Sequence, residues 1–388
     1  MEVPGRRGDG RTMKACILTV VHVHNDNRIF YKQLPALLEA GYQITYVVPC
    51  PAELKMDSRV ELIPLPQIPR WRRFQNWGKA LAAALRSGAD IFHFHDPELI
   101  PVGLVLRALT RRPVIYDVHE NNPQVVLRRL WIPRLLRVPA AKGMALLEWL
   151  ACRFLDGIVV ANPPTAERIY RFARRAVQVA NYVELAHFDT PPQTPSLAQP
   201  DGPSFIYSGS LSTQRGVLDC LQAFELLNRP DARLTLVGPL DDADPSMADL
   251  PRRLPPRVRL LPPQPFANIP PLLRSSLAGL VTLHPTPNYL EIIPTKLLEY
   301  MAAAIPVIAY DLPLVRPIVK QSKCGILIEP QDVRAMAEAM AYILDHPEDA
   351  KEMGRRGREA VEEKFCWESE KRKLLALYQG LLSPRRGL

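Results

Sequence analysis

The sequence NYLEIIPTKLLEYM, residues 288–301, carries a proline that is expected to open a helix. Pro294 suits a first helical turn because its missing N–H would have no helical partner there in any case. The backbone amides that follow are then expected to point out of the helix start, where they and the positive end of the helix dipole favour a bound phosphate. These amides belong to Thr295, Lys296 and Leu297.

Two glutamates flank this proline, with seven residues between them. Glu299 lies four residues after Thr295 on the same helix face and could reach past a phosphate to a ribose diol. Glu291 precedes the helix in a loop that would face a sugar. The pair therefore predicts a site for a nucleotide sugar, with an ordinary amphipathic helix carrying two solvated carboxylates as the alternative.

The same stretch resembles the signature of the family-four retaining glycosyltransferases, in which seven residues separate two glutamates. One subgroup reads Pro-x-Lys-Leu-x-Glu-Tyr-Met-Ala-Ala followed by Pro-Val-Ile-Ala, and residues 294–303 and 306–309 match it. The resemblance covers nearly the whole chain from Met13 onward. It implies the GT-B architecture, an α/β fold of two facing Rossmann-like, doubly wound domains with a cleft between them. It also implies retaining transfer of a hexose-type sugar from a nucleoside diphosphate sugar to an acceptor hydroxyl.

The length and composition fit a globular protein of two domains. The 388 residues are 47% apolar and 23% charged, and no run of 18 or more uncharged apolar residues could span a bilayer. The first twelve residues lack the apolar stretch of a secretory signal, so we expect a cytoplasmic protein, soluble or peripheral to the membrane. Six cysteines are scattered without paired spacing, which favours reduced thiols over disulfides.

Short runs rich in Val and Ile alternate with helical patterns, which indicates repeated βαβ units and parallel sheets. A stretch dense in Pro, Gln, Ser and Thr separates two such series and is expected to be a linker. A charged amphipathic helix follows the second series, and the resemblance implies that it returns to the first domain. The predicted scheme is an N-terminal extension at 1–12, an acceptor-side Rossmann-like domain at 13–188, a linker at 189–203, a nucleotide-sugar-binding Rossmann-like domain at 204–366 and the returning helix at 367–388.

A second donor-binding candidate is the segment YSGSLSTQRGV, residues 207–217, which reads as a strand, a glycine turn and a helix start. It resembles the family segment in which a Lys or Arg before Gly-Val contacts the diphosphate, and it supplies Gly209, Ser210 and Arg215. Many relatives carry an arginine where this chain has Ser210, so one phosphate cation is missing or supplied elsewhere. Lys296 is the second cation, because positioned positive charge must hold a leaving diphosphate. The alternatives are a solvated arginine near a helix start and a snorkelling lysine.

The first domain offers histidines and an Asp-x-Arg-Ile segment. His119 ends an apolar strand in VIYDVHEN, residues 114–121, and resembles the family histidine beside the transferred sugar. A neutral imidazole there could accept a sugar hydroxyl. Asp26 and Arg28 stand where many relatives have a glycine-rich loop, and we expect them to line the acceptor side or the donor phosphates. A local salt bridge that caps the next helix is the alternative, and His95 is a further acceptor-side candidate.

Histidine pairs raise the question of a metal. His93 with His95, and His22 with His24, each lie on one strand face, a spacing that could suit a metal. No residue set of zinc spacing completes either pair, and the resemblance implies a reaction without a divalent ion. We therefore expect neither a metal nor another cofactor.

The net charge of +9 is compatible with a nucleic acid, an anionic membrane or a diphosphate ligand. No nucleic-acid-binding motif is present, so we expect no nucleic acid partner. Two segments combine arginines with tryptophans, which fits peripheral binding to anionic lipid, with loops that merely cover the sheet as the alternative. They contain Arg70, Trp71, Arg72, Arg73 and Trp77, and Arg128, Arg129, Trp131, Arg134 and Arg137.

One residue departs from the resembled pattern at the end of the glutamate-bearing helix. Ala304 stands where relatives usually place a glycine. If the backbone there needs a left-handed conformation, alanine would cost roughly 1 kcal/mol. We expect this to affect stability rather than chemistry.

The sequence thus predicts a glycosyltransferase of glycan, lipopolysaccharide, exopolysaccharide or glycolipid synthesis, with a UDP- or GDP-sugar donor and a glycan or lipid-linked acceptor. The catalytic candidates are His119 and Glu291. A nucleotide-sugar epimerase and a non-catalytic glycan- or membrane-binding protein of the same fold are the alternatives. A nicotinamide oxidoreductase is disfavoured because no Gly-x-Gly-x-x-Gly follows the first strand.

Overall fold

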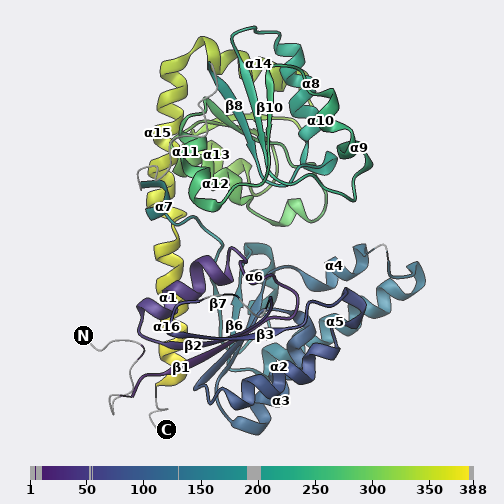
Figure 1. Cartoon of the computed structure of the whole chain (residues 1–388), viewed down its shortest axis with the longest axis vertical. Coiled ribbons are helices and arrows are strands. Elements are labelled where there is room, and N and C mark those ends of the chain that lie inside the picture. The colour runs from purple at the N-terminus through teal and green to yellow at the C-terminus, as the bar shows by residue number, and fades with distance from the viewer. Residues whose placement is uncertain are drawn as a thin grey trace. The chain divides into compact units, whose positions relative to one another are not determined.

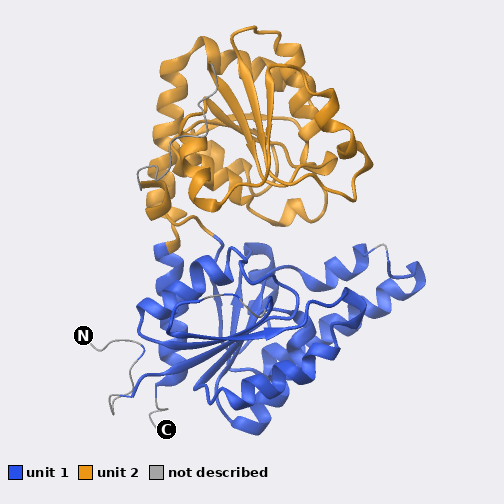
Figure 2. Ribbon diagram, viewed as in Figure 1, with its two compact units in different colours: residues 1–181, 368–388 blue, residues 182–367 orange. Residues whose placement is uncertain are grey.

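The computed structural model describes residues 5, 11–51, 54, 56–129, 131–189 and 202–383. The chain forms two compact units, unit 1 with residues 1–181 and 368–388 and unit 2 with residues 182–367 (Figure 2). The division falls before the predicted end of the first domain at residue 188, because Phe188 is buried in the core of unit 2. Most of the predicted N-terminal extension and of the predicted linker lies outside the described residues.

Unit 1 is built on a parallel sheet of seven strands. They are β1 (Lys14–Leu18), β2 (Gln43–Pro49), β3 (Val60–Leu65), β4 (Ile91–Phe94), β5 (Val114–Val118), β6 (Gly157–Val160) and β7 (Ala176–Gln178), in the order β3-β2-β1-β4-β5-β6-β7. The central strands are buried on both faces, as expected for a parallel sheet that helices cover (Figure 1). The strand order reverses between β1 and β4, and ligands of such sheets bind outside the carboxyl ends of the strands at that point.

Helices connect these strands, and the last helix of the chain joins them. They are α1 (Leu34–Glu39), α2 (Gln75–Arg86), α3 (Ile100–Thr110), α4 (Asn122–Arg128), α5 (Arg134–Phe154), α6 (Pro163–Tyr170) and α16 (Trp367–Leu382), with the short helices η1 (Ile29–Gln33), η2 (Arg70–Arg72) and η3 (Pro97–Leu99). The hydroxyl of Tyr378 on α16 lies 2.8 Å from Nδ1 of His93 on β4. The carboxylate of Glu370 accepts the amide of Ala180 at 2.7 Å. Helix α16 is therefore part of the unit 1 core.

Unit 2 repeats the plan with six parallel strands. They are β8 (Ser204–Ser208), β9 (Arg233–Val237), β10 (Val258–Leu261), β11 (Ala278–Val281), β12 (Val307–Tyr310) and β13 (Gly325–Ile328), in the order β10-β9-β8-β11-β12-β13. Its helices are α7 (Ala186–Asp189), η4 (Thr213–Arg215), α8 (Val217–Leu227), α9 (Pro245–Ala248), α10 (Leu250–Arg253), η5 (Phe266–Asn268), α11 (Ile269–Arg274), η6 (Tyr289–Glu291), α12 (Thr295–Ala302), α13 (Arg316–Ser322), α14 (Val333–Asp345) and α15 (Pro347–Lys364). The order reverses between β8 and β11, so the same rule points to the loops after these two strands.

Helix α12 ends in a paired hydrogen-bond motif that requires a left-handed residue. The amide of Ala304 donates to the carbonyl of Met301 at 3.0 Å, and the amide of Ile305 donates to the carbonyl of Tyr300 at 3.2 Å. Ala304 has φ +57 and is exposed. This is the Schellman pattern, in which glycine is the usual residue because it has no Cβ. The conformation that the sequence analysis considered for Ala304 is present.

Replacing Ala304 with Gly should stabilise unit 2 by about 0.5–1 kcal/mol, because it removes left-handed strain at an exposed position where the methyl group fills no core space. Denaturant unfolding monitored by circular dichroism measures the change. Ala341→Gly, within α14, is the matched control and should lose about 1 kcal/mol. A loss of stability in Ala304→Gly as well would contradict the strain argument.

Candidate active site

Lys296 is buried at the start of α12, and its ammonium group lies over an aromatic ring. Its Nζ is 3.4 Å from the centroid of the Tyr207 ring, and the residue is only 6% exposed. A Cβ at Gly209 would lie 3.5 Å from the same Nζ, so glycine leaves the ammonium its space. Nζ has no hydrogen-bond partner among the described residues. A buried ammonium group without a hydrogen-bond partner is energetically unfavourable. The Lys296 ammonium on the face of the Tyr207 ring therefore favours an anionic ligand.

The other predicted donor-binding charges lie near this lysine. Burial lowers the pKa of Lys296 well below its ordinary value, the guanidinium of Arg215 lowers it further, and the carboxylate of Glu299 acts in the opposite direction. The Cζ atom of Arg215 lies 5.8 Å from the centroid of the Tyr289 ring, in the short helix η6 that also contains Glu291. The structure therefore brings the two cations and both glutamate-bearing segments to the same part of unit 2.

The backbone that carries Arg215 is fixed by the loop after β11. Gly216 follows Arg215 with φ +72, and a Cβ there would lie 2.1 Å from the carbonyl oxygen of Thr282. The Thr282 hydroxyl donates to the carbonyl of Arg215 at 3.0 Å, and the amide of His284 donates to the carbonyl of Gln214 at 3.0 Å. Only glycine lets the backbone at residue 216 come this close to Thr282, and this contact holds the preceding residue, Arg215, in place.

A hydrogen-bond network that the sequence patterns did not indicate supports the same loop. Nε2 of His284 lies 2.7 Å from Oδ2 of Asp219, and the Tyr310 hydroxyl donates to the same oxygen at 2.5 Å. The three residues come from the loop after β11, from α8 and from the end of β12. No spacing in the sequence links them, so only the order of the strands β8, β11 and β12, which precede or carry these residues, could have indicated the network.

Gly209 and Ser210 form the turn after β8. Gly209 has φ +127, and its amide donates to the carbonyl of Val237 at 2.9 Å. A Cβ at Gly238 would lie 2.1 Å from the carbonyl oxygen of Gly209, so two glycines allow these turns to touch. The Tyr207 hydroxyl donates to the carbonyl of Ser210 at 3.2 Å, which orients the ring under Lys296.

The start of α12 differs from the prediction in two details. Pro294 is the residue before the helix, with ψ 125°, and the helix begins at Thr295. The amide of Leu297 donates to the carbonyl of Pro294 at 3.1 Å, so it is already used and the prediction that it points outward is wrong. The amides of Thr295 and Lys296 belong to the first helical turn, whose N–H groups have no partner within the helix.

Arg28 in unit 1, predicted to line the acceptor side or the donor phosphates, forms a buried ion pair. It is 4% exposed, and its Nε and Nη2 each lie 3.0 Å from a carboxylate oxygen of Asp117. Gln33 donates to the same carboxylate at 2.7 Å. Burial raises the pKa of Asp117, but opposing electrostatic effects, led by the guanidinium of Arg28, hold it far below its ordinary value. The pair joins residues far apart in sequence and fixes the loop after β1 to β5.

Asp26 accepts backbone amides at the start of the short helix η1, while the ion pair of Arg28 is with the distant Asp117, so the alternative of a capping local salt bridge is only partly met. Its Oδ1 accepts the amides of Arg28 at 2.9 Å and Ile29 at 3.0 Å, and its Oδ2 lies 3.3 Å from Nδ1 of His22. Burial raises the pKa of Asp26, but the contact with His22 and these amides hold it at about 2. The residue is half-buried, so its second oxygen remains near the surface beside His22.

His95 and His119 meet at the carboxyl ends of β4 and β5. Nδ1 of His95 lies 3.2 Å from Nε2 of His119, and the backbone carbonyl of His119 accepts a hydrogen bond from Asn162 at 2.7 Å. Burial lowers the pKa of His119 to about 3 and that of His95 well below its ordinary value. Both rings are therefore neutral at physiological pH, as the predicted role of His119 requires.

His93, His95 and Asp117 could in principle hold a metal ion, because one ligand atom of each lies within 4.8 Å of the others. The Asp117 carboxylate, however, already binds Arg28 and Gln33. A guanidinium in that position competes directly with a metal cation for the same oxygens. The donor set of these three residues therefore fits a metal poorly.

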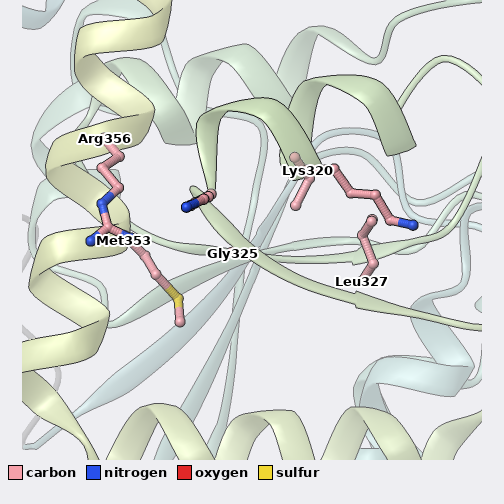
Figure 3. A pocket seen from close by; sticks show the side chains of 7 residues that line it. Lys320, Gly325, Leu327, Met353 and Arg356 are labelled. Atoms are coloured by element: carbon pink, nitrogen blue, oxygen red, sulfur yellow. The ribbon is translucent and has the colours of Figure 1, made fainter.

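A separate pocket lies at the edge of the unit 2 sheet. Figure 3 shows Met353 and Arg356 of α15 on one side and Gly325 and Leu327 of β13 on another. Strand β13 is the last strand of the sheet, whereas Lys296 lies near β8 at the reversal point. The pocket is therefore distinct from the candidate donor site.

The family models describe both halves of the chain. The model of the group 1 glycosyl transferases matches residues 193–360, and the model of glycosyltransferase family 4 matches residues 27–186. Models of glycosyltransferases thus match most of the chain, which identifies it as a glycosyltransferase. Among the curated relatives of this glycosyltransferase, glycogen synthase of Mycobacterium tuberculosis H37Rv is 22% identical, with 91% of this chain and 89% of that protein covered. The alpha-D-kanosaminyltransferase of Streptomyces kanamyceticus is 26% identical, with 61% of this chain and 62% of that protein covered.

Solved structures share the fold of this glycosyltransferase. Sucrose-phosphate synthase from Thermosynechococcus elongatus superimposes with a TM-score of 0.72 at 22% identity, covering 96% of this chain and 100% of that chain. The Anabaena protein HepE in complex with UDP and glucose gives a TM-score of 0.70 at 14% identity, covering 95% and 100%. The predicted GT-B fold of two Rossmann-like domains is thereby confirmed.

In this glycosyltransferase, replacing Arg28 with Met should lower the free energy of unfolding by about 3–5 kcal/mol, because it leaves the buried Asp117 carboxylate without its cation. The double variant Arg28→Met/Asp117→Asn should recover part of that loss. Arg59→Met breaks an exposed pair with Asp57 in the same unit and should cost no more than about 1 kcal/mol. Urea unfolding at neutral pH measures all three, and equal losses for Arg28→Met and Arg59→Met would refute the structural role.

Proposed function

We propose that this glycosyltransferase is retaining and metal-independent, and that it transfers a sugar from a nucleoside diphosphate sugar to an acceptor hydroxyl. The observation that carries the proposal is Lys296, a buried ammonium without a hydrogen-bond partner among the described residues and close to Arg215. A diphosphate placed there would gain two cations and the amides at the start of α12. This is the charge stabilisation that departure of a diphosphate needs, and it assigns to side chains the role that a divalent ion plays in other enzymes.

The donor chemistry follows from the neighbours of these cations. Glu299 is proposed to bind the ribose diol, and Glu291 to bind hydroxyls of the transferred sugar. Relatives of the same fold support a nucleotide-sugar donor, since HepE was solved with UDP-glucose and the Escherichia coli trehalose-6-phosphate protein was solved with UDP-2-fluoro glucose. A uridine nucleotide is therefore the first donor to test, followed by guanosine and adenosine nucleotides.

The proposed reaction needs no protein nucleophile. The bond between the anomeric carbon and the diphosphate oxygen breaks, and the acceptor oxygen forms its bond on the same face of the sugar. The proton of the acceptor hydroxyl passes to an oxygen of the leaving phosphate. Lys296 and Arg215 stabilise the charge that develops there, and the neutral ring of His119 accepts a hydroxyl hydrogen bond from the sugar.

The proposed acceptor is a hydroxyl of a glycan or of a lipid-linked sugar in envelope polysaccharide or glycolipid synthesis, and the proposed location is cytoplasmic and peripheral to a membrane. The two segments of unit 1 that combine arginines with tryptophans support the lipid-linked class of acceptor. Acceptor specificity in such enzymes rests on a few loop contacts, so fold similarity alone does not select the acceptor.

Lys296→Met should lower kcat/KM for the donor by about 10- to 150-fold, the equivalent of one lost charge-assisted bond of about 1.5–3 kcal/mol. It should also reduce the thermal stabilisation given by UDP. The matched control is Lys320→Met, at an exposed lysine of α13, which should leave both quantities unchanged. Wild-type nucleotide binding and turnover in Lys296→Met would remove the main support for this donor site.

A separate experiment tests whether the enzyme retains the anomeric configuration and whether it is a transferase or an epimerase. Incubation of the enzyme and a UDP-sugar with an acceptor should give a product that keeps the anomeric configuration of the donor, as seen by proton NMR, and excess EDTA should not slow the reaction. An inverted product would exclude the retaining mechanism. Release of an epimerised nucleotide sugar in the absence of any acceptor would identify an epimerase.

A further inference from the structure

A helical hairpin of unit 1 presents apolar side chains that no described part of the chain covers. Helices α4 and α5 pack on each other, and Figure 1 shows them extending beyond the edge of the sheet. At the turn and in the first turns of α5, Trp131 is 63% exposed and Leu135 is 91% exposed, with Leu136 and Val138 more than half exposed. Apolar groups gathered in this way mark a binding surface more often than isolated ones do.

The charges on the hairpin that carries these apolar groups are predominantly positive. In residues 121–154 the only acidic residue is Glu148, which is fully buried and binds Asn122 and Arg168. The cations of the same stretch are Arg128, Arg129, Arg134, Arg137, Lys142 and Arg153. Residues 121–154 therefore carry six cations and no exposed acid of their own, and the exposed Glu120 directly precedes them.

The basic and aromatic segment that contains Arg70, Trp71 and Arg73 lies close to the hairpin. Burial lowers the pKa of Arg129, and the charge of Arg70 and then that of Arg73 lower it further, opposed by Glu98 and Glu120. Trp71, between these two arginines, is 70% exposed, and the Cζ atom of Arg72 lies 4.4 Å from the centroid of its ring. The fold thus brings together two segments that are far apart in the sequence, and both contribute exposed tryptophan and arginine.

We propose that this surface, hereafter the hairpin surface, docks on an anionic lipid bilayer. It consists of Trp71, Trp131, Leu135, Leu136 and Val138 with the arginines around them. Arginine and tryptophan suit the headgroup region, and leucine suits the acyl boundary below it. None of the described helices has both the length and the apolarity to cross a bilayer. The hairpin surface therefore lies on the membrane and does not span it.

Charge and polarity favour lipid over the other possible occupants. A second copy of the same surface would place arginines against arginines, which like-charge repulsion opposes. A nucleic acid would satisfy the arginines, but it would leave Leu135 and Leu136 in water. An anionic bilayer satisfies both kinds of side chain.

The position of the hairpin links docking to the proposed reaction. Strand β5 ends at Val118, His119 follows, and α4 begins at Asn122. The hairpin thus leaves the sheet at the strand end that carries the proposed sugar-binding histidine. If the proposed function holds, a lipid-linked acceptor in the bilayer would be presented near this edge of unit 1; the docking itself does not depend on the reaction.

Flotation of the full-length protein with vesicles tests the proposal. Vesicles of equal parts phosphatidylglycerol and phosphatidylcholine should bind the protein at least about tenfold more strongly than pure phosphatidylcholine vesicles. Two double variants, Leu135→Ser/Leu136→Ser and Arg134→Glu/Lys142→Glu, should each reduce binding to the anionic vesicles at least about tenfold. The matched controls Leu226→Ser and Arg252→Glu change exposed residues of unit 2 and should bind as the wild type does.

Two further measurements separate the possible failures. The thermal transition and the UDP-induced shift of each variant should equal those of the wild type, which shows that the fold and the donor site are intact. Equal flotation of wild type, hairpin variants and controls would overturn the proposal, as would no binding to anionic vesicles. Light scattering without lipid tests for a dimer, and a wild-type dimer that Leu135→Ser/Leu136→Ser dissociates would also overturn the proposal. Preferential binding to DNA fragments over vesicles would overturn it as well.

Discussion

Each unit buries a cation near the carboxyl ends of its central strands. Whether a side chain of the fold pairs with that cation indicates whether the cation supports the structure or binds a ligand. Arg28 meets the Asp117 carboxylate through two hydrogen bonds, which neutralise its charge within the fold, while its Nη1 has no hydrogen-bond partner among the described residues. Lys296 rests on the face of Tyr207 and has no hydrogen-bond partner among the described residues. Because an uncompensated buried charge is unfavourable, the second arrangement favours an anion and the first does not.

The parts of the fold that follow from local chemistry could be predicted from the sequence. The alternation of Val- and Ile-rich runs with helical patterns indicates parallel sheets, and both sheets of the structure are parallel. The donor segment could be predicted from single residues: glycine permits a positive φ, proline favours a helix start, and arginine supplies a charge that suits a phosphate. Gly209, Gly216 and Ala304 all have the positive φ that such reasoning needs.

The contacts between distant segments could not be predicted in this way. Asp117 reads as one more residue of an apolar strand, and nothing in the pattern shows that Arg28 will meet it. The same holds for Asp219, which meets His284 and Tyr310 from another element. Hydrophobic periodicity fixes which face a residue occupies, but the pairing of buried charges depends on strand order, which single-sequence patterns do not contain.

Helix α16 gives unit 1 a discontinuous construction with a consequence for biosynthesis. The ring of His93 and the amide of Ala180 find partners in Tyr378 and Glu370, which are translated only after the whole of unit 2. Domains generally fold as they leave the ribosome. Unit 2 is continuous in sequence and does not depend on a later segment. The His93 ring and the Ala180 amide of unit 1, in contrast, lack their hydrogen-bond partners until α16 has been synthesised. Unit 1 can therefore complete its core only after the whole of unit 2 has been synthesised.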